Sequence, residues 1–182
     1  INNIKPFGIY LLDENKVPLE NKKIHFSVKD SNQKVNTFLG VTDSYGYCEY
    51  KMAYASGVYL IETSFLGDDE YKSSLNKNIF VINERTDKNN TSVKITNNIV
   101  DNKNGTFVCN YDLKNDFNMI NDYLTLVSYD ENGYYDIRKI ATGKNGTGSV
   151  TIEPKSTVTV INSLFTGNVN YPAYEYLSLI YK

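Results

Sequence analysis

The chain has 182 residues, including 16 tyrosines, two cysteines and no tryptophan, and its formal net charge at pH 7 is −2. Its lysines and arginines are scattered along the sequence, which excludes the concentrated positive charge expected of a protein that binds nucleic acid or an anionic membrane. No apolar run approaches the ~18 residues that a membrane-spanning helix needs.

Alternation of apolar and polar residues predicts β-strands throughout the first half of the chain. Phe7, Ile9 and Leu11, for example, share one face of the first strand. Turns rich in Asn, Asp, Ser and Gly separate the apolar segments, as in Thr42-Asp43-Ser44-Tyr45-Gly46. We expect six strands here, near residues 7–11, 24–28, 37–41, 48–52, 58–65 and 75–82.

A polar segment then separates the two halves. Residues 83–90 carry no hydrophobic side chain, and such a segment cannot be held in a core. We therefore predict domains at residues 1–83 and 91–182, joined by a polar linker at 84–90. The second domain is expected to form strands near residues 91–95, 106–113, 123–129, 134–142, 148–153, 157–165 and 174–181.

The second half repeats the pattern of the first. Phe65-Leu66-Gly67 followed by Tyr71 recurs 100 positions later as Phe165-Thr166-Gly167 followed by Tyr171. The same offset aligns Phe7 with Phe107, Ile9 with Cys109, Leu11 with Tyr111, Val17 with Phe117, Leu19 with Met119, Ile24 with Leu124, Phe26 with Leu126, Thr42 with Thr142 and Gly46 with Gly146. A repeat of this size predicts two copies of one fold.

The repeat also indicates what the first copy lacks. By the same offset, the counterpart of the strand at 91–95 would lie before residue 1, so we expect domain 1 to lack or shorten its first strand. The chain begins at Ile1 without an initiator methionine, which favours a piece of a longer polypeptide. Short strands with polar turns and no helical periodicity predict an all-β fold of two tandem antiparallel β-sandwiches.

Residues of the kinds that carry out catalysis are few. His25 is the only histidine and is expected to point outward, so neither a Ser-His-Asp triad nor a histidine metal site is expected. Cys48 and Cys109 occupy inward positions of different domains, where they are expected as free, buried thiols. We therefore predict no catalytic residue, no cofactor and no metal site, and we do not expect an enzyme.

The densest acidic cluster is Asp68-Asp69-Glu70, which together with Asp43 or Asp13 could offer oxygens to Ca²⁺. Its counterpart Asn168-Val169-Asn170 loses the charge, whereas the glycine before it and the tyrosine after it are kept. We therefore favour a structural turn and keep a calcium site as the alternative.

Gly57-Val58-Tyr59 precedes an alternating strand, in the manner of the tyrosine corner of immunoglobulin-like sandwiches, in which the hydroxyl binds a nearby backbone group. Thr159 stands at the matching position of the second half.

Two sets of surface residues are candidate sites. Asn-x-Ser/Thr sequons occur at Asn89, Asn90, Asn104 and Asn145, and they fit an exported protein that can be glycosylated. Tyr45, Tyr47, Tyr134 and Tyr135 adjoin turns and are candidates for stacking on sugars or anchoring a partner. Cross-strand packing of these tyrosines is the alternative, and the more common one.

Several motifs of the first half suggest a family. They are Gly8-Ile9-Tyr10-Leu11 with Asp13, Val17-Pro18-Leu19, Lys23-Ile24-His25-Phe26, Thr42-Asp43 with Gly46, Gly57-Val58-Tyr59, and Phe65-Leu66-Gly67-Asp68 with Tyr71. This set resembles the tandem prokaryotic (bacterial) immunoglobulin-like repeats of adhesin-like cell-surface proteins, notably those of methanogenic archaea. The resemblance covers nearly all of residues 6–82 and is weaker in the second half, where Phe165, Gly167, Asn168 and Tyr171 fit.

The resemblance implies surface-displayed spacer or attachment modules without catalytic residues. We accordingly expect an extracellular, adhesin-like fragment that mediates adhesion or holds a binding region away from the cell. Its expected partners are neighbouring immunoglobulin-like repeats of the same polypeptide and an unidentified protein or glycan on a cell surface. The alternatives are a carbohydrate-binding accessory module of a surface enzyme and a structural component of a surface layer.

Overall fold

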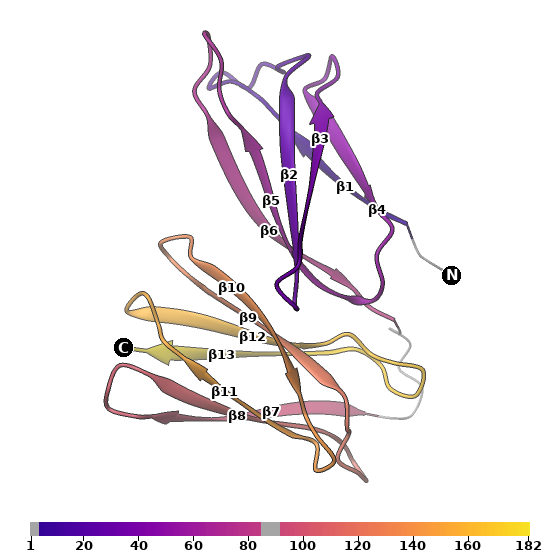
Figure 1. Cartoon of the computed structure of the whole chain (residues 1–182), viewed down its shortest axis with the longest axis vertical. Helices are drawn as coiled ribbons and strands as arrows, with labels where there is room; N and C mark the ends of the chain where they lie inside the picture. The colour runs from indigo at the N-terminus through magenta and orange to yellow at the C-terminus, as the bar shows by residue number, and fades with distance from the viewer. Residues whose placement is uncertain (1–3, 85–91) are drawn as a thin grey trace. The chain divides into compact units, whose positions relative to one another are not determined.

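The computed structural model describes residues 4–84 and 92–182, which form 13 strands and no helix (Figure 1). The chain divides into two compact units, one made of most residues up to Phe80 and the other made of Val81–Lys182 together with Ser31–Gln33 and Ser56–Val58. We call the parts that contain β1–β6 and β7–β13 domain 1 and domain 2. Most of the predicted linker at 84–90 lies outside the described residues.

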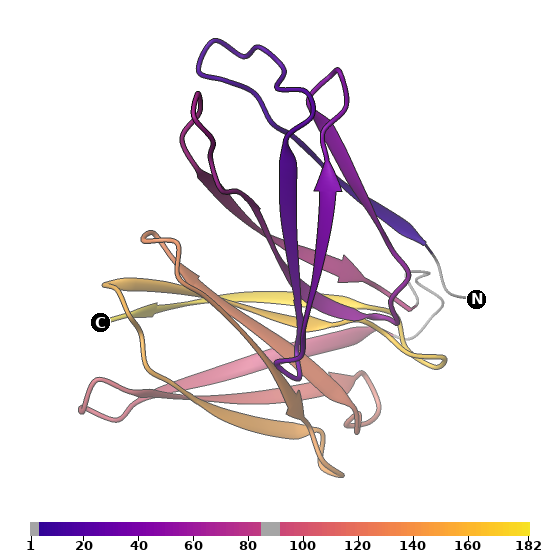
Figure 2. The same cartoon turned by 45° about the horizontal axis from the view of Figure 1, so that its top comes forward.

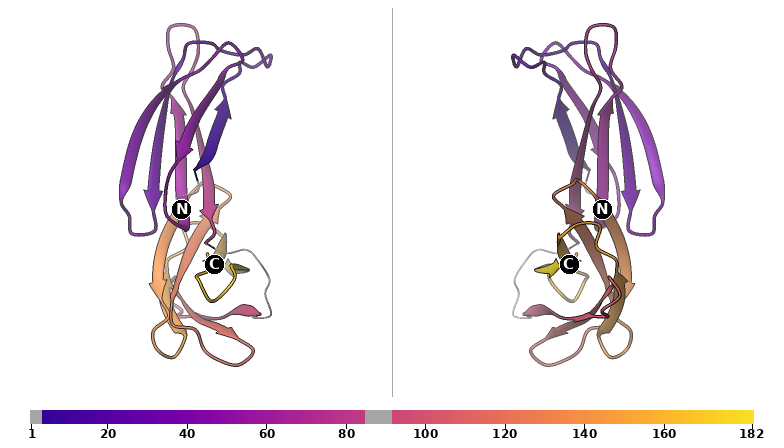
Figure 3. Two further views of the ribbon diagram at one scale, coloured as in Figure 1. Left: turned by 90° about the vertical axis from the view of Figure 1, so that its right-hand side faces the viewer. Right: turned by 90° about the vertical axis from the view of Figure 1, so that its left-hand side faces the viewer.

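Domain 1 is a sandwich of two antiparallel sheets (Figure 3). The smaller sheet pairs β1 (Lys5–Tyr10) with β4 (Tyr47–Met52). The larger sheet has the order β3-β2-β5-β6 and consists of β2 (Lys23–Asp30), β3 (Val35–Val41), β5 (Gly57–Phe65) and β6 (Ser74–Ile82). Side chains from both sheets form the core, with Ile24, Phe26, Cys48 and Phe65 buried.

Domain 2 is a sandwich of the same kind with one more strand (Figure 2). Its smaller sheet has the order β11-β8-β7, from β7 (Val93–Asp101), β8 (Phe107–Asn115) and β11 (Thr147–Ile152). Its larger sheet has the order β10-β9-β12-β13, from β9 (Tyr123–Asp130), β10 (Tyr135–Ala141), β12 (Val158–Phe165) and β13 (Tyr174–Tyr181). The core lies between the sheets and includes Ile95, Tyr111, Leu113, Leu124, Ile161 and Phe165.

The two domains correspond strand by strand, with β1–β6 matching β8–β13 in order and in sheet. Within residues 4–84, no strand corresponds to β7. The prediction of two tandem all-β sandwiches is therefore confirmed.

The constant offset of 100 residues is wrong in the first strand of the repeat. The amide of Leu11 donates to Gly46 O at 2.8 Å, and the matching donor in domain 2 is the amide of Leu113, which donates to Gly146 O at 2.8 Å. Phe7, Ile9 and Leu11 therefore correspond to Cys109, Tyr111 and Leu113, two positions later than the sequence alignment places them. A shift of two residues leaves the same residues on the inner face of a strand, so alternation alone cannot detect it.

The offset returns to 100 at the start of the second strand of each copy. Lys22 and Asp122 each donate their amide to a buried threonine hydroxyl, Thr42 Oγ1 and Thr142 Oγ1, at 2.9 Å. The segment from Leu11 to Lys22 is thus two residues longer than the segment from Leu113 to Asp122, and it absorbs the difference. Val17 and Phe117, aligned in the sequence, are both exposed in these loops.

Candidate functional site

The acidic cluster at Asp68 forms a turn that is repeated in domain 2. Asp68 Oδ1 accepts hydrogen bonds from the amides of Glu70 and Tyr71 at 3.0 and 2.9 Å. Asn168 Oδ1 accepts from the amides of Asn170 and Tyr171 at 2.8 and 2.9 Å. The glycine before each turn has a positive φ, 86° at Gly67 and 83° at Gly167, a conformation that glycine adopts without steric cost.

Lys22 holds the remaining carboxylate oxygen of Asp68. Its ammonium lies 2.5 Å from Asp68 Oδ2. The hydrogen bond from Lys22 lowers the pKa of the Asp68 carboxyl, and the same bond raises the pKa of Lys22. Both oxygens of Asp68 are thus engaged, Oδ1 within the turn and Oδ2 by Lys22. Among residues 4–84 and 92–182, no three His, Cys, Asp or Glu side chains are arranged to hold a metal ion.

Tyr59 forms the hydrogen bond of a tyrosine corner. Its hydroxyl donates to Ala55 O at 2.8 Å, and its ring stacks on Tyr54 with a centroid distance of 5.1 Å. At the matching position of domain 2, Thr159 is buried and its hydroxyl has no hydrogen-bond partner among the described atoms. The corner therefore stabilises domain 1 alone.

The two candidate tyrosines of domain 1 lie in different environments. Tyr45 is 73% exposed at the tip of the turn between β3 and β4. Tyr47 packs its ring against Tyr10, with 5.0 Å between centroids, and donates its hydroxyl to Glu49 at 2.8 Å. The same ring covers Gly8, where an added Cβ would lie 2.3 Å from the Tyr47 hydroxyl oxygen. Tyr45 is free to contact a partner, whereas Tyr47 is engaged in its own sheet.

The candidate tyrosines of domain 2 show the same division. Tyr134 is 39% exposed. Tyr135 stacks on Tyr129, its neighbour across the strands, with 5.5 Å between centroids and 15° between planes. Each pair of tyrosines therefore supplies one outward ring and one ring that packs across strands.

Two of the four sequons lie within the described residues. Asn104 and Asn145 are both exposed in turns of domain 2. Asn104 Oδ1 accepts hydrogen bonds from Thr106 N and Oγ1 at 3.1 and 2.7 Å, so the asparagine and the threonine of this sequon are held together in one turn. Asn89 and Asn90 lie outside the described residues.

His25 and the two cysteines lie where the sequence predicted them. His25 is exposed on β2. Cys48 and Cys109 are free thiols, buried in the cores of domain 1 and domain 2, and burial raises the pKa of both. A raised pKa favours the thiol over the thiolate, which is the form that reacts.

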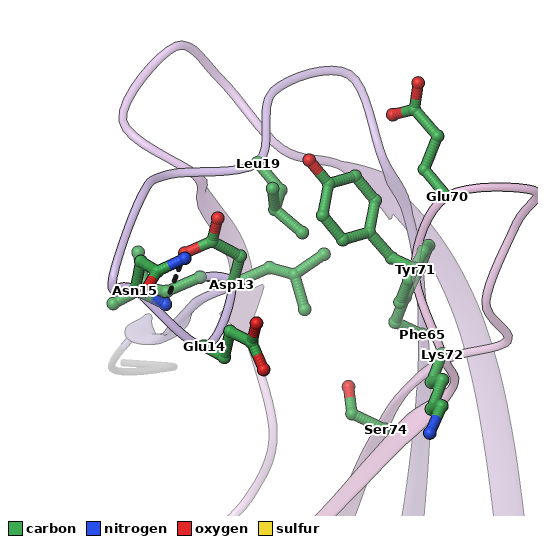
Figure 4. Close-up of a pocket in the computed structure, with 11 residues that line it drawn as sticks. Asp13, Glu14, Asn15, Leu19, Phe65, Glu70, Tyr71, Lys72 and Ser74 are labelled. Atoms are coloured by element: carbon green, nitrogen blue, oxygen red, sulfur yellow. Dashed lines mark hydrogen bonds between the residues drawn. The ribbon is translucent and has the colours of Figure 1, made fainter.

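A hollow that the sequence did not predict opens in domain 1 (Figure 4). It has a volume of about 410 Å³ and lies between the loop after β1 and the turn between β5 and β6. Leu11, Leu19, Phe65 and Tyr71 form its apolar wall, and the polar side chains of Asp13, Glu14, Asn15, Glu70, Lys72 and Ser74 surround it. Asp13 is fixed by hydrogen bonds that its Oδ1 accepts from the amides of Asn15 and Val17, each at 2.8 Å.

A second hollow of about 100 Å³ lies beside the first, between β1 and β6. Its lining includes Ile9, Leu11, Ile24, Ser74 and Asn76. The sequence held one signal for both hollows. Ser74 stands where domain 2 has Tyr174, whose ring packs against the core, and replacing an aromatic ring by a hydroxymethyl group leaves space.

None of the described segments is a helix long and apolar enough to cross a bilayer. No protein-family model matches the chain, and no curated protein matches it either.

Solved structures do resemble it. A tetra-tandem repeat from the extending region of a large adhesion protein has a TM-score of 0.41 and 14% identity, over 90% of this chain and 42% of that one. Parabacteroides merdae β-glucuronidase has a TM-score of 0.32 and 13% identity, and the match covers 87% of this chain and 20% of the enzyme. Native E. coli α-2-macroglobulin has a TM-score of 0.37 and 10% identity, and the match covers 98% of this chain and 13% of the macroglobulin. The chain thus spans about two fifths of the adhesion-protein structure.

Proposed function

We propose that the chain is a non-catalytic, adhesin-like part of a cell-surface protein, whose sandwich domains hold a binding region away from the cell. The observation that carries the proposal is the path of the chain through domain 2. That path starts at one end of the sandwich and finishes at the other.

Pairings within domain 2 define this path. β7 begins at Val93, which pairs with Asn115, and it ends at Asp101, which pairs with Phe107. Phe107 pairs in turn with Ile152, the last residue of β11. Lys182, just after β13, lies at this same end, because its ammonium donates to Pro154 O at 3.2 Å. β7 and β13 therefore run in the same direction, and the chain leaves the domain at the end opposite to Val93 (Figure 1).

This path suits a domain that bears tension. A strand of nine residues spans about 30 Å, so the chain traverses the sandwich along its length. Ladder hydrogen bonds between antiparallel strands lie across the strand direction. A pull along the strands therefore loads the bonds of β7 to β8 and of β12 to β13 together, rather than one after another.

What the two domains share also supports a structural role. In each, a buried threonine hydroxyl donates to a backbone carbonyl, from Thr42 to Leu19 O at 2.6 Å and from Thr142 to Ile120 O at 2.8 Å. The anchored turn at Asp68 and Asn168 is the other shared feature. Exposed positions differ, as at Tyr45, which is Asn145 in domain 2. The common set of interactions joins backbone and side chains within each sandwich.

We place this protein outside the cell, next to further immunoglobulin-like repeats and in contact with a protein or glycan. The exposed sequons at Asn104 and Asn145 support this placement. A carbohydrate-binding accessory module is the second candidate, because Tyr45 and Tyr10 are 73% and 67% exposed and could stack on sugar rings.

Force spectroscopy on the 182-residue chain tests the spacer role. Handles are attached to cysteines introduced beside Val93 and at Lys182, which pull domain 2 from end to end. In the matched control they are attached at Lys103 and Lys182, which lie at the same end. We expect end-to-end loading to unfold domain 2 at the higher force. Equal forces in the two geometries would contradict the spacer role.

A glycan array tests the second candidate on the same chain. Saturable binding to a sugar that is lost on Tyr45→Ala, or on Tyr134→Ala with Tyr135→Ala, would favour the carbohydrate module. We expect no sugar-dependent binding.

A further inference from the structure

Two segments of domain 2 share the sequence Lys-Asn-Gly-Thr, at residues 103–106 and 144–147. The first lies in the turn between β7 and β8, and the second leads into β11. Asn104 and Asn145 are both exposed. In an Asn-Gly pair the backbone nitrogen of the glycine can attack the side-chain carbonyl carbon of the asparagine, because glycine has no Cβ to obstruct the approach. With identical residues in the two segments, any difference in this reaction comes from the fold.

The two glycine amides differ in what they bind. The amide of Gly146 donates to Gly143 O at 3.2 Å, and the carbonyl of Gly146 accepts from the amide of Leu113 at 2.8 Å. The amide of Gly105 donates to no acceptor within residues 4–84 and 92–182. An added Cβ at Gly105 would meet nothing within 4 Å, whereas one at Gly146 would lie 2.7 Å from Leu113 O. The nitrogen of Gly105 is therefore free to approach a side chain, and that of Gly146 is held.

The side chain of Asn104 is also held in a reactive position. Its Oδ1 accepts hydrogen bonds from Thr106 N and Oγ1 at 3.1 and 2.7 Å. A bond to the amide two residues on folds an asparagine side chain back along the peptide unit that follows it. The two donors face the oxygen on which negative charge develops when the carbonyl carbon is attacked, and donors so placed stabilise that charge. Asn145 Oδ1 has no such donor among the described residues.

A third Asn-Gly pair, Asn132-Gly133, lies in the turn between β9 and β10. The amide of Gly133 donates to Asp130 O at 3.2 Å. The amides of Asn132 and Tyr134 donate to Asp130 Oδ1 at 2.9 and 3.1 Å. Asp130 thus holds the nitrogen of Gly133 in place, as Gly143 holds that of Gly146.

We propose that Asn104 deamidates without an enzyme in the folded protein, with the backbone nitrogen of Gly105 as the nucleophile. Water removes the proton from Gly105 N as this nitrogen bonds to Cγ of Asn104. The Cγ–Nδ2 bond then breaks, and Nδ2 takes up a proton and leaves as ammonia. A water molecule opens the resulting cyclic imide. Cleavage between Gly105 N and Cγ gives aspartate, and cleavage between Gly105 N and the backbone carbonyl carbon gives isoaspartate, so one water is consumed for each ammonia released.

This reaction changes the turn in two ways. It places a carboxylate close to Asp101, which accepts a hydrogen bond from Lys103 N at 2.8 Å and pairs with the Lys103 ammonium at 3.0 Å. It also destroys the sequon at Asn104, so deamidation and glycosylation compete for the same side-chain nitrogen. The fraction converted at this turn therefore records how long an unglycosylated molecule has existed. None of this depends on the spacer role proposed above.

Peptide mapping by mass spectrometry tests the proposal on the unglycosylated 182-residue chain, incubated folded near neutral pH. Conversion is followed separately at Asn104, Asn132 and Asn145. We expect Asn104 to convert roughly fivefold faster than Asn145 or more, because the amide of Gly146 must first give up a hydrogen bond. In urea that unfolds the chain, we expect Asn104 and Asn145 to convert at similar rates, since their neighbouring residues are identical.

Two variants test the hydrogen bonds to Asn104 Oδ1. Thr106→Val removes the Oγ1 donor, and we expect it to slow conversion at Asn104 roughly fivefold. Thr106→Ser keeps this donor and should convert close to the rate of the unaltered chain. Both variants leave the segment around Asn145 unchanged, so its rate is the internal reference. If Thr106→Val disturbs the turn, the comparison of Asn104 with Asn145 in the unaltered chain still decides the question.

Three results would overturn the proposal. One is conversion of Asn132 or Asn145 in the folded chain as fast as that of Asn104. Another is a difference between Asn104 and Asn145 that persists in urea, since the fold would not be its cause. The third is equal conversion in Thr106→Val and Thr106→Ser, which would remove Thr106 from the reaction. The force measurement on domain 2 is independent of all three.

Discussion

The ammonium of Lys22 lies 2.5 Å from Asp68 Oδ2, and domain 2 makes the same link with different chemistry. There Asp122 replaces Lys22, and Asn168 Nδ2 donates to Asp122 Oδ2 at 2.6 Å. Each link joins the start of one strand of the larger sheet, β2 or β9, to the turn that follows a second strand, β5 or β12. The geometry is shared, but only domain 1 depends on an ion pair.

This difference predicts acid sensitivity in domain 1. The pKa of Asp68 is lowered in the folded state, chiefly by the hydrogen bond from Lys22. Its contribution to stability is therefore complete above the unfolded-state pKa and is lost as the pH falls below about 4. We expect Asp68→Asn, which keeps the turn as Asn168 does, to flatten the fall in domain 1 stability between pH 5 and pH 2.

Amide hydrogen exchange across that pH range, which separates the two domains, measures the effect. Asp69→Asn is the control, because it removes the same charge from the same turn without touching Lys22. Identical pH profiles for Asp68→Asn and the unaltered chain would contradict the prediction.

Removal of the hydroxyl is expected to destabilise the protein at Tyr59 but not at Tyr111. The Tyr59 hydroxyl donates to Ala55 O at 2.8 Å, so Tyr59→Phe should lower the free energy of unfolding of domain 1 by about 1 kcal/mol. The Tyr111 hydroxyl is buried near Ser163 and Cys109, but it makes no hydrogen bond of normal geometry with the described atoms. Tyr111→Phe should therefore leave domain 2 unchanged or stabilise it. Denaturant unfolding of each variant measures both, and equal losses would count against the assignment.

Gly146 cannot be replaced without moving the backbone. Its φ is 66°, and an added Cβ would lie 2.7 Å from Leu113 O. Gly133 has a φ of 78° but open space around the same position. We expect Gly133→Ala to cost about 1 kcal/mol from backbone strain, and Gly146→Ala to cost roughly 1–3 kcal/mol more. Thermal unfolding of the two variants compares them, and similar losses would be inconsistent with a steric role for Gly146.

The buried hydroxyl of Thr142 is expected to stabilise domain 2 through two hydrogen bonds. It accepts from the amide of Asp122 at 2.9 Å and donates to Ile120 O at 2.8 Å. Thr142→Val keeps the shape but leaves both backbone groups unpaired, which should cost about 2–3 kcal/mol. Thr142→Ser keeps the hydroxyl and should lower the free energy of unfolding clearly less than Thr142→Val does. Urea unfolding distinguishes them, and a valine variant as stable as the serine variant would refute the role.

The strands were predictable because apolar alternation and turn residues act locally. The predicted strand at 174–181 has the bounds of β13, and the one at 123–129 ends a single residue before β9 does. The pairing of Phe7 with Phe107 was wrong because a two-residue difference in the following loops moves no side chain to the other face. Hydrogen bonds to Gly46 and Gly146 fix that register, and no sequence pattern reports them.

The candidate site was less predictable, because exposure depends on residues that are distant in sequence. Tyr47 covers Gly8 and Tyr135 stacks on Tyr129, so only their neighbours Tyr45 and Tyr134 project outward to any extent. The hollows of domain 1 are lined by residues that are distant in the sequence, from the loop after β1 and the turn between β5 and β6. Ser74, in place of Tyr174, was the one local sign of them.

Because the chain crosses domain 2 from end to end, unfolding of this domain would release extra chain length between its two neighbours. Folded, the run from Val93 to Tyr181 advances the chain by about the length of one strand, ~30 Å. Unravelled, the same residues reach roughly 300 Å. A single domain that yields under sudden load would thus lengthen its tether about tenfold before any covalent bond is strained, and refolding would draw the tether back.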